Sequence, residues 1–338
     1  MAQPSQVLII NNPGFNEPWD IVEAELKKRG VSVTRCLNRH ALMEDREALA
    51  NAEVVLAFGI PFGREMMTLM PRLCAVVSPV IGTDWIDEVA ATELGIIVGN
   101  GQFPEHYQSL AEANVMLMLV CLCDLHAREA ILRHNLPRPP HPTGRMMAGK
   151  LIGMIGFGHI ARAIEARLRG WQVRIQTYIP RMPREPLPPG VERVALDELI
   201  KTSDIINVLC PLNEETRGMI NAELIGLMKP DAILINTARG GIVDEQALYE
   251  AARDKRIGKI AMDVFAVEPL PVDSPLRKLD NTILTSHMIG HSREARERVP
   301  YVALENVSQI LLGTPPAYVR NPEVIPQWLR RWGKSPSG

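Results

Sequence analysis

The sequence predicts an α/β protein built on mostly parallel sheets. Short β-branched runs alternate with amphipathic helical stretches along most of the 338 residues. A glycine-rich turn in mid-chain, from Gly156 to Ala161, follows an apolar run and opens a helical stretch. Polar residues come directly after several predicted strands in the second half. These observations indicate two successive α/β series, with ligands bound where the strands of the second series end.

The first series occupies roughly residues 1–100. Its predicted strands are QVLIIN, VSVTRC, EVVLAF, CAVVSPV and IIVGN. Helical stretches separate them, such as DIVEAELKKRG, whose final glycine suits a helix C-cap. A long helix is expected next, over residues 109–133, and it is apolar almost all round, so we expect it to be buried. The proline-rich stretch LPRPPHPTGR then predicts a loop or linker.

The second series begins at Leu151. Its predicted strands are LIGMIGFG, VRIQTYI, DIINVLCPL, AILINTA, KIAMDVF and TILTSHM. A last helix is expected over residues 293–312, with a kink or break at Pro300 because proline cannot donate the helical hydrogen bond.

Composition excludes several classes of protein. A net charge of −2 gives no electrostatic reason to expect nucleic-acid or membrane-surface partners. The longest apolar run, Val115 to Cys123, is too short to span a bilayer, and MAQPSQ does not resemble a signal peptide. The five cysteines are scattered, without CxxC, which favours free thiols in a reducing cytoplasm over a zinc site. We therefore expect a cytoplasmic protein with a small-molecule ligand and no metal.

The glycine turn has the pattern GxGxxA and the context of a dinucleotide site. Gly156 permits the tight turn, Gly158 lets the backbone approach a pyrophosphate, and Ala161 is small enough for close packing of helix on strand. The start of the helix offers free N–H groups to the phosphates. An ordinary strand–turn–helix connection is the plainer alternative.

The stretch QTYIPRMPR lies where the acid of an NAD site is expected, about 20 residues after the turn. Ile179 and Pro180 stand there instead, followed by Arg181 and Arg184. Loss of the acid removes repulsion of a 2′-phosphate, and the arginines offer it charge-assisted hydrogen bonds, Arg181 being the better placed. We therefore expect NADP(H) to be preferred over NAD(H), although a solvated basic loop is the alternative.

Three further motifs place complementary polar side chains after strands. Arg239 lies in NTARGGIVDE, Glu268 in DVFAVEPL and His287 in TSHMIGHS. Reduction of a 2-oxo acid needs a cation for the carboxylate, a proton donor for the developing alkoxide, and a partner that holds the donor. Arg239, His287 and Glu268 can supply these in turn, since a carboxylate beside the histidine should keep the imidazolium available.

These landmarks, together with CPLNEETRGMIN, resemble the D-isomer-specific 2-hydroxyacid dehydrogenase family over nearly the whole chain. The resemblance implies catalytic roles for Arg239, Glu268 and His287, and substrate contacts from Ile81 and Gly82 in VIGTDWID. The cofactor positions that the motifs imply are Gly156, Phe157, Gly158, His159, Ile160, Ile179, Pro180, Arg181, Arg184, Cys210, Pro211, Thr216, Thr237, Ala238, Asp263 and Gly290.

The resemblance also implies two doubly wound parallel-sheet domains. A Rossmann nucleotide domain, residues 102–289, would be inserted in a flavodoxin-like substrate domain formed by residues 1–101 and 290–338. The active site is expected in a cleft between them, with domain closure as a step. A homodimer is expected too, as the family usually forms.

Several alternatives stay open at this stage. The leading hypothesis is reduction of a small 2-oxo acid, such as glyoxylate or hydroxypyruvate, to a D-2-hydroxy acid. C-terminal-binding-protein corepressors resemble the same family, keep its dinucleotide site and act by binding other proteins. The formate dehydrogenase branch is disfavoured, because it carries extra residues around its histidine that TILTSHMIGHS lacks. A dehydrogenase of the L-lactate/malate type is also disfavoured, because its glycine motif would lie near the N-terminus and here it lies in mid-chain.

Overall fold

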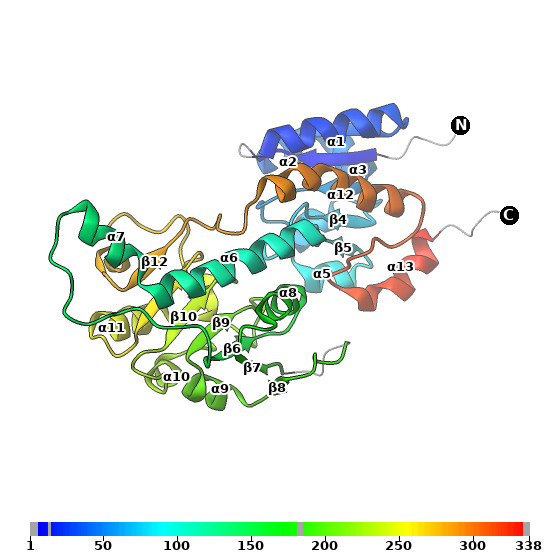
Figure 1. Ribbon diagram of the computed structural model, residues 1–338. Helices are drawn as coiled ribbons and strands as arrows, with labels where there is room; N and C mark the ends of the chain where they lie inside the picture. Colours follow the sequence, from blue (N-terminus) through cyan, green and yellow to red (C-terminus); the bar gives the residue numbers. More distant parts are fainter. Residues whose placement is uncertain (1–5, 13–14, 181–184, 334–338) are drawn as a thin grey trace. The chain divides into compact units, whose positions relative to one another are not determined.

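The computed structural model describes residues 6–12, 15–180 and 185–333 (Figure 1). The chain forms two compact units. Unit 1 comprises Met1–Glu105 and Arg293–Gly338, and unit 2 comprises His106–Ser292. Unit 2 is therefore one continuous segment set between two segments of unit 1. Within the described ranges, no helix has the length and apolar character needed to cross a membrane.

Unit 1 is built on a five-stranded parallel sheet of order β2-β1-β3-β4-β5, the flavodoxin-like order. Its elements are β1 Gln6–Ile10, α1 Asn16–Lys28, β2 Ser32–Cys36, α2 Arg39–Glu44, α3 Arg46–Asn51, β3 Ala52–Leu56, α4 Arg64–Thr68, β4 Ala75–Val77, α5 Glu88–Glu93, β5 Ile97–Gly99, α12 Arg293–Leu311, η4 Pro322–Val324 and α13 Ile325–Trp332. Apolar side chains pack on both faces of the sheet, with α1, α12 and α13 covering one of them.

Unit 2 is built on a seven-stranded parallel sheet of order β12-β11-β10-β9-β6-β7-β8. The order reverses between β6 and β9, as in a Rossmann sheet. Its elements are β6 Leu151–Ile155, α8 His159–Leu168, β7 Arg174–Tyr178, β8 Val191–Arg193, α9 Leu196–Thr202, β9 Ile205–Val208, α10 Ala222–Gly226, β10 Ile233–Asn236, η2 Gly240–Ile242, α11 Glu245–Arg253, β11 Lys259–Met262, η3 Pro275–Lys278 and β12 Thr282–Leu284. The α/β class with two doubly wound parallel sheets is confirmed.

Two helices, α6 Pro104–Cys123 and α7 Leu125–Arg133, lead into unit 2. One face of the large sheet packs against α6 and α8, and the other packs against α9, α10 and α11. Asp204 secures the edge where the central strands begin, since it accepts from the Leu151 N–H at 2.8 Å and from Lys229 Nζ at 2.7 Å. Burial of Asp204 opposes ionisation, but the Lys229 ammonium and the Leu151 N–H outweigh it, so the pKa of Asp204 is lowered.

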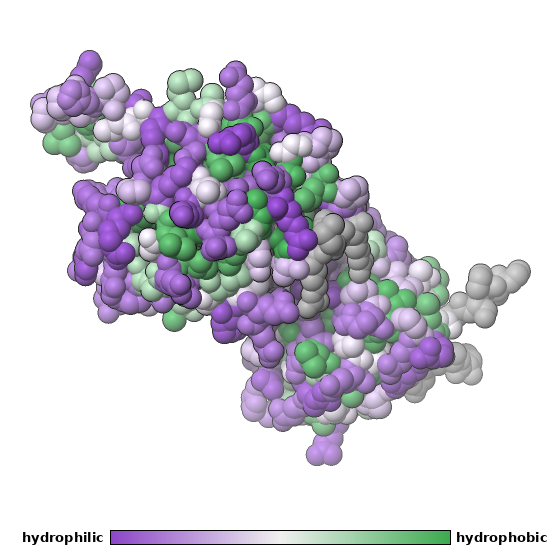
Figure 2. Space-filling view, turned by 90° about the horizontal axis from the view of Figure 1, so that it is seen from below, coloured by the Kyte–Doolittle hydropathy of each residue, from purple (hydrophilic) through white to green (hydrophobic). Residues whose placement is uncertain are grey.

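The prediction of a single buried helix over residues 109–133 is wrong, because the segment forms two helices, α6 and α7. The chain leaves the helical conformation at Asp124, which has a left-handed φ of 53°. Its carboxylate pairs with Lys259 Nζ at 2.6 Å, at the start of β11, and this distant contact holds the break. The following helix, α7, buries none of its residues. At its left edge, where Figure 1 places α7, Figure 2 shows a few hydrophobic residues among mainly hydrophilic ones.

The last helix also differs from its expectation. α12 runs from Arg293 to Leu311 without a break at Pro300. Pro300 is buried together with Val299 and Ala303, so packing on this face holds the helix although one backbone hydrogen bond is lost. The short edge strand β8 was not predicted at all.

Candidate active site

The glycine turn between β6 and α8 has the geometry of a phosphate loop. Gly156 has φ 98°, and a Cβ there would lie 3.0 Å from the backbone of Leu209 and Cys210 at the end of β9. Only glycine fits this close approach. Gly158 is the N-cap of α8, and a Cβ on it would meet nothing within 4 Å. The turn therefore faces open space beside the N–H groups that begin α8, where a pyrophosphate can lie.

The side chains of the turn divide between core and surface. Phe157 is buried and lies under the Arg162 guanidinium, 5.5 Å from its ring centroid. His159 is exposed and stacks on Tyr107 of α6, with ring centroids 5.2 Å apart. Ile160 is half-buried against the core between α6, α8 and the sheet. His159 is thus the polar side chain of the turn at the start of α8.

The next strand, β7, ends in the residues that replace the acid of an NAD site. Ile179 is only 7% exposed, so its side chain belongs to the core, whereas Pro180 is exposed. The Ile179 carbonyl accepts from Arg193 of β8 at 2.9 Å. Arg181 and Arg184, the expected phosphate ligands, lie outside the described residues.

The loop after β9 is braced by its own side chains. Thr216 donates to the Pro211 carbonyl at 2.7 Å and accepts from the Asn213 N–H at 2.8 Å. The Thr216 hydroxyl therefore stabilises the backbone of the loop. Cys210 is a half-buried free thiol, and burial raises its pKa to about 11. The thiolate, the reactive form of cysteine, is accordingly disfavoured there.

The loop after β10 carries Arg239 and is held by buried amides. Asn236 donates to the Arg239 carbonyl at 2.9 Å and accepts from the Ala238 N–H at 3.1 Å. Thr237 exchanges hydrogen bonds with Asn114 of α6, at 3.0 and 3.2 Å. Arg239 itself is half-buried and donates Nη1 to the Ala238 carbonyl at 2.7 Å. The Arg239 guanidinium therefore extends from a turn whose backbone is held by these hydrogen bonds.

Close packing fixes the same turn against the next one. A Cβ on Gly240 would lie 1.9 Å from the Phe265 carbonyl carbon, so the loops after β10 and β11 touch backbone to backbone. Any side chain at this position would force the Arg239 turn away from the turn that carries Glu268.

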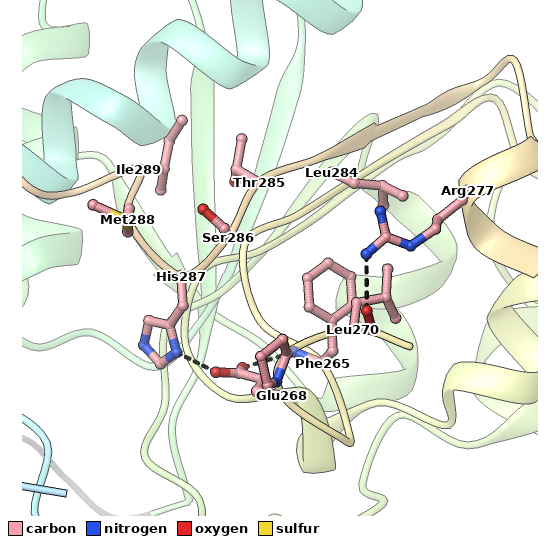
Figure 3. Close-up of a pocket in the computed structure, with 11 residues that line it drawn as sticks. Phe265, Glu268, Leu270, Arg277, Leu284, Thr285, Ser286, His287, Met288 and Ile289 are labelled. Carbon is pink, nitrogen blue, oxygen red and sulfur yellow. Dashed lines mark hydrogen bonds and ion pairs between the residues drawn. The ribbon is translucent and has the colours of Figure 1, made fainter. Parts of the chain in front are cut away.

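His287 and Glu268 form a hydrogen-bonded pair. Nδ1 of His287 lies 2.7 Å from Oε2 of Glu268, whose Oε1 accepts from the Phe265 N–H at 2.9 Å (Figure 3). The pair is partly open, with the His287 side chain 44% exposed and that of Glu268 35% exposed. Nε2 of His287 has no partner in the described part of the chain. Glu268 therefore fixes the orientation of the His287 ring and leaves Nε2 available to bind a ligand.

Asp263, at the end of β11, holds the loop that carries His287. Its Oδ1 accepts from the Thr285 hydroxyl at 2.6 Å and from the N–H groups of Met288 at 3.1 Å and Ile289 at 3.2 Å. Asp263 is 3% exposed, and His287 has a left-handed φ of 57°. A buried carboxylate thus stabilises a strained backbone at the histidine.

A hollow of about 820 Å³ lies beside the His287–Glu268 pair (Figure 3). Its walls are mainly apolar, from Phe265, Leu270 and Leu284, with Arg277 in the lining as well. Arg277 donates to the Leu270 carbonyl at 2.8 Å and the Pro271 carbonyl at 2.9 Å. The histidine therefore stands at the wall of a cavity.

In unit 1, the expected substrate loop presents backbone donors. The carbonyl of Ile81 accepts from Asn100 Nδ2 and that of Gly82 from Ser78 Oγ, both at 2.9 Å. The N–H groups of Ile81 and Gly82 donate to nothing in the described ranges. A loop fixed through its carbonyls with open N–H groups can hold an anion.

Some positioning residues were missed in the sequence. Asn114 and Ser109 of α6 bond to Thr237 and to the Gly290 carbonyl, the latter at 2.8 Å. Thr285 bonds to Asp263. A polar residue inside an apolar helix was the available signal for Asn114; nothing local marked the other two. In the described part of the chain, no group of three His, Cys, Asp or Glu side chains could hold a metal.

Comparison with known proteins identifies the family of this chain. A family model described as "D-isomer specific 2-hydroxyacid dehydrogenase, NAD binding domain" matches residues 115–289, more than half of the chain. The chain belongs to this family. The resemblance inferred from the motifs is confirmed, and with it an oxidoreductase that has a nucleotide-binding domain.

The similar proteins carry several names. A glyoxylate reductase of Thermofilum pendens is 36% identical over 338 residues, covering 96% of each chain. A D-3-phosphoglycerate dehydrogenase of Methanocaldococcus jannaschii is 35% identical over 300 residues, which are 88% of this chain and 56% of that protein. The chain thus spans little more than half of that relative. A solved protein of Thermus thermophilus is 30% identical, with TM-score 0.76 and 93% and 99% of the two chains covered. An acyclic imino acid reductase in complex with NADPH and D-Arg is 26% identical, with TM-score 0.81 and the same coverage.

Proposed function

We propose that the protein reduces a small 2-oxo acid to a D-2-hydroxy acid with NADPH. The observation that carries the proposal is the 2.7 Å pair of His287 and Glu268, with Nε2 left available. Glyoxylate and hydroxypyruvate are the proposed substrates, in keeping with the names of relatives such as the reductases of Thermofilum pendens and Thermotoga maritima.

Each residue of the proposed site has a distinct task. Arg239 binds the substrate carboxylate with its planar fork. In unit 1, the N–H groups of Ile81 and Gly82 are the proposed substrate contacts. His287 donates a proton from Nε2 to the developing alkoxide, and Glu268 holds the ring in position for that transfer. The reduced nicotinamide, when bound, supplies the hydride.

The residues present suit a dinucleotide. The open space at Gly158 and the N–H groups at the start of α8 fit a pyrophosphate. The core position of Ile179 leaves no carboxylate to accept the ribose hydroxyls or to repel a 2′-phosphate. NADPH is therefore the proposed cofactor, with Arg181 and Arg184 as proposed ligands of its 2′-phosphate.

Turnover on a substrate panel tests the activity. Oxidation of NADPH should follow addition of glyoxylate or hydroxypyruvate, and Arg239→Ala should reduce kcat/KM by at least about a hundredfold, as expected for loss of a buried charge-assisted contact. Arg253→Ala, which removes an exposed arginine of α11, is the matched control. Absence of turnover on any 2-oxo acid, with dinucleotide binding intact, would instead favour the corepressor-like alternative.

The cofactor preference has its own test. The ratio of kcat/KM for NADPH over NADH should exceed one and should fall in Arg181→Ala. An enzyme that uses NADH equally well, whether or not Arg181 is present, would disprove the preference.

A homodimer is proposed for the assembly. Exposed apolar side chains lie on and just after α7: Leu125 is 50% exposed, Leu132 86% and Leu136 51%. Exposed apolar surface of this kind favours binding of a protein partner. In a symmetric homodimer, each copy would bury this surface against the same surface of the other. Light scattering should give the mass of two chains, and Leu132→Glu should shift it toward one chain. A monomeric wild-type protein would reject the dimer.

A further inference from the structure

The hollow beside the His287–Glu268 pair is larger than a small 2-oxo acid needs. Its volume of about 820 Å³ lies within the range of about 300–1,000 Å³ that is typical of sites for larger organic ligands. Three segments of unit 2 form its walls: the turn after β11, the η3 turn, and the chain from the end of β12 to Ile289. Arg239, the proposed contact of the substrate carboxylate, does not line it. The hollow therefore has room for a ligand other than the substrate.

Apolar side chains supply most of the wall. Phe265 and Leu270 come from the turn after β11 and are buried at the edge of the core. Leu284 belongs to β12, the edge strand of the large sheet, and is only half-buried. A ligand with an apolar body would remove Leu284 from water, and an aromatic body would also pack against the Phe265 ring. The walls thus favour a ligand whose body is apolar.

Arg277 supplies a positive charge to this apolar wall. Its Nε donates to the Pro271 carbonyl at 2.9 Å and its Nη2 to the Leu270 carbonyl at 2.8 Å. These bonds hold the guanidinium in place and use two of the five N–H groups that an arginine carries. Within the described residues, no carboxylate forms an ion pair with Arg277. In the view of Figure 3, Arg277 and the hydrogen-bonded histidine–glutamate pair lie on opposite sides of Phe265. The remaining N–H groups suit a carboxylate, because the planar fork can donate two hydrogen bonds to it.

We propose that this hollow is a second ligand site, which takes a small monocarboxylate with an apolar or aromatic body. The carboxylate binds Arg277, and the body lies against Phe265 and Leu284. The ligand also covers the loop that carries His287, since residues 285–289 line the same hollow. These contacts are separate from those proposed for the 2-oxo acid, so the site goes beyond the proposed reaction.

Calorimetric titration of the full-length, cofactor-free protein tests the site with two matched probes. 3-Phenylpropionate carries the carboxylate, and 3-phenylpropanamide has the same body without the charge. Wild type should bind the acid about fivefold more tightly than the amide, as expected for an ion pair with an exposed arginine. In Arg277→Met the two probes should bind equally, because the charge that distinguishes them is lost. Bound acid should also slow hydrogen exchange of the amides of residues 285–289.

Two control variants locate the probe. Lys278→Met removes the neighbouring exposed cation of η3, which does not line the hollow, and should bind both probes as wild type does. Arg239→Ala should keep the wild-type preference for the acid, because Arg239 lies outside the walls of the hollow.

Three results would overturn the proposal. A preference for the acid that persists in Arg277→Met would show that this arginine does not bind the carboxylate. A preference that disappears in Arg239→Ala would place the acid at the proposed substrate site. Acid binding that weakens as the protein concentration rises would assign the hollow to a second copy of the chain instead of a small ligand.

Discussion

Replacing Asp263 by Asn should loosen the loop that carries His287. The buried carboxylate accepts from the Thr285 hydroxyl and from the N–H groups of Met288 and Ile289, at 2.6, 3.1 and 3.2 Å from Oδ1. Hydrogen bonds to an ionised acceptor contribute about 1.5–3 kcal/mol each, against about 0.5–1.5 kcal/mol for neutral ones. The amide therefore loses about 1 kcal/mol per bond, and about 2 kcal/mol for the set once non-additivity is allowed for.

The left-handed backbone of His287 adds to the effect. This conformation costs a non-glycine residue about 1–2 kcal/mol, so a loop released from Asp263 gains by relaxing. Hydrogen exchange on the cofactor-free protein measures the opening directly. A loss of about 2 kcal/mol corresponds to about thirtyfold faster exchange of the amides of residues 285–290.

Asp273→Asn is the matched control, because Asp273 is an exposed carboxylate nearby in the chain. It should leave exchange of the His287 loop unchanged. Protection in Asp263→Asn within about twofold of the wild-type value would refute the reasoning, since the charge on Asp263 would then contribute nothing to the loop. The readout needs no cofactor, so a direct contact between Asp263 and nicotinamide cannot produce the same result.

Three other predictions concern single side chains. Glu268→Gln should lower kcat about tenfold to a hundredfold with little change in unfolding temperature, because His287 loses its ionised partner; unchanged turnover in steady-state assays would contradict this. Asp204→Asn should destabilise the protein at about pH 7 by about 1 kcal/mol in urea titrations, since the contact with Lys229 is lost. Because the pKa of Asp204 is lowered in the folded state, wild type should be more stable than Asp204→Asn above pH about 4 and should lose this extra stability as the pH falls through the folded-state pKa. A difference in unfolding free energy that grows in acid would contradict the prediction. Cys210, with its pKa raised to about 11, should resist iodoacetamide at about pH 7.5 in peptide mass mapping, and rapid labelling would show that the thiol is not buried.

Local pattern was enough to predict most strands and the motif residues. Runs such as QVLII and ILIN are β-branched and buried, so they occur as strands wherever the sheet places them. The placement of Arg239, Glu268 and His287 after strands followed from the same pattern, because parallel strands end at one edge of a sheet.

Long-range contacts explain what the sequence did not reveal. The break at Asp124 depends on Lys259, 135 residues away, and nothing in CLCDLHAR signals it. Arg193 lies in a three-residue strand that has no apolar pattern. The bonds from Asp263 to the His287 loop span more than twenty residues, so they require the fold before they can be recognised.

The hydrogen bond from Ser109 to the Gly290 carbonyl has a consequence for how the gene could have been assembled. Unit 2 is continuous from His106 to Ser292, and this 2.8 Å bond joins positions close to its two ends. A segment whose ends meet can be inserted into a loop of a host protein, or exchanged for another, without cutting any strand of its own sheet. Such a cassette carries its glycine turn, Arg239, Glu268 and His287 as one transferable piece.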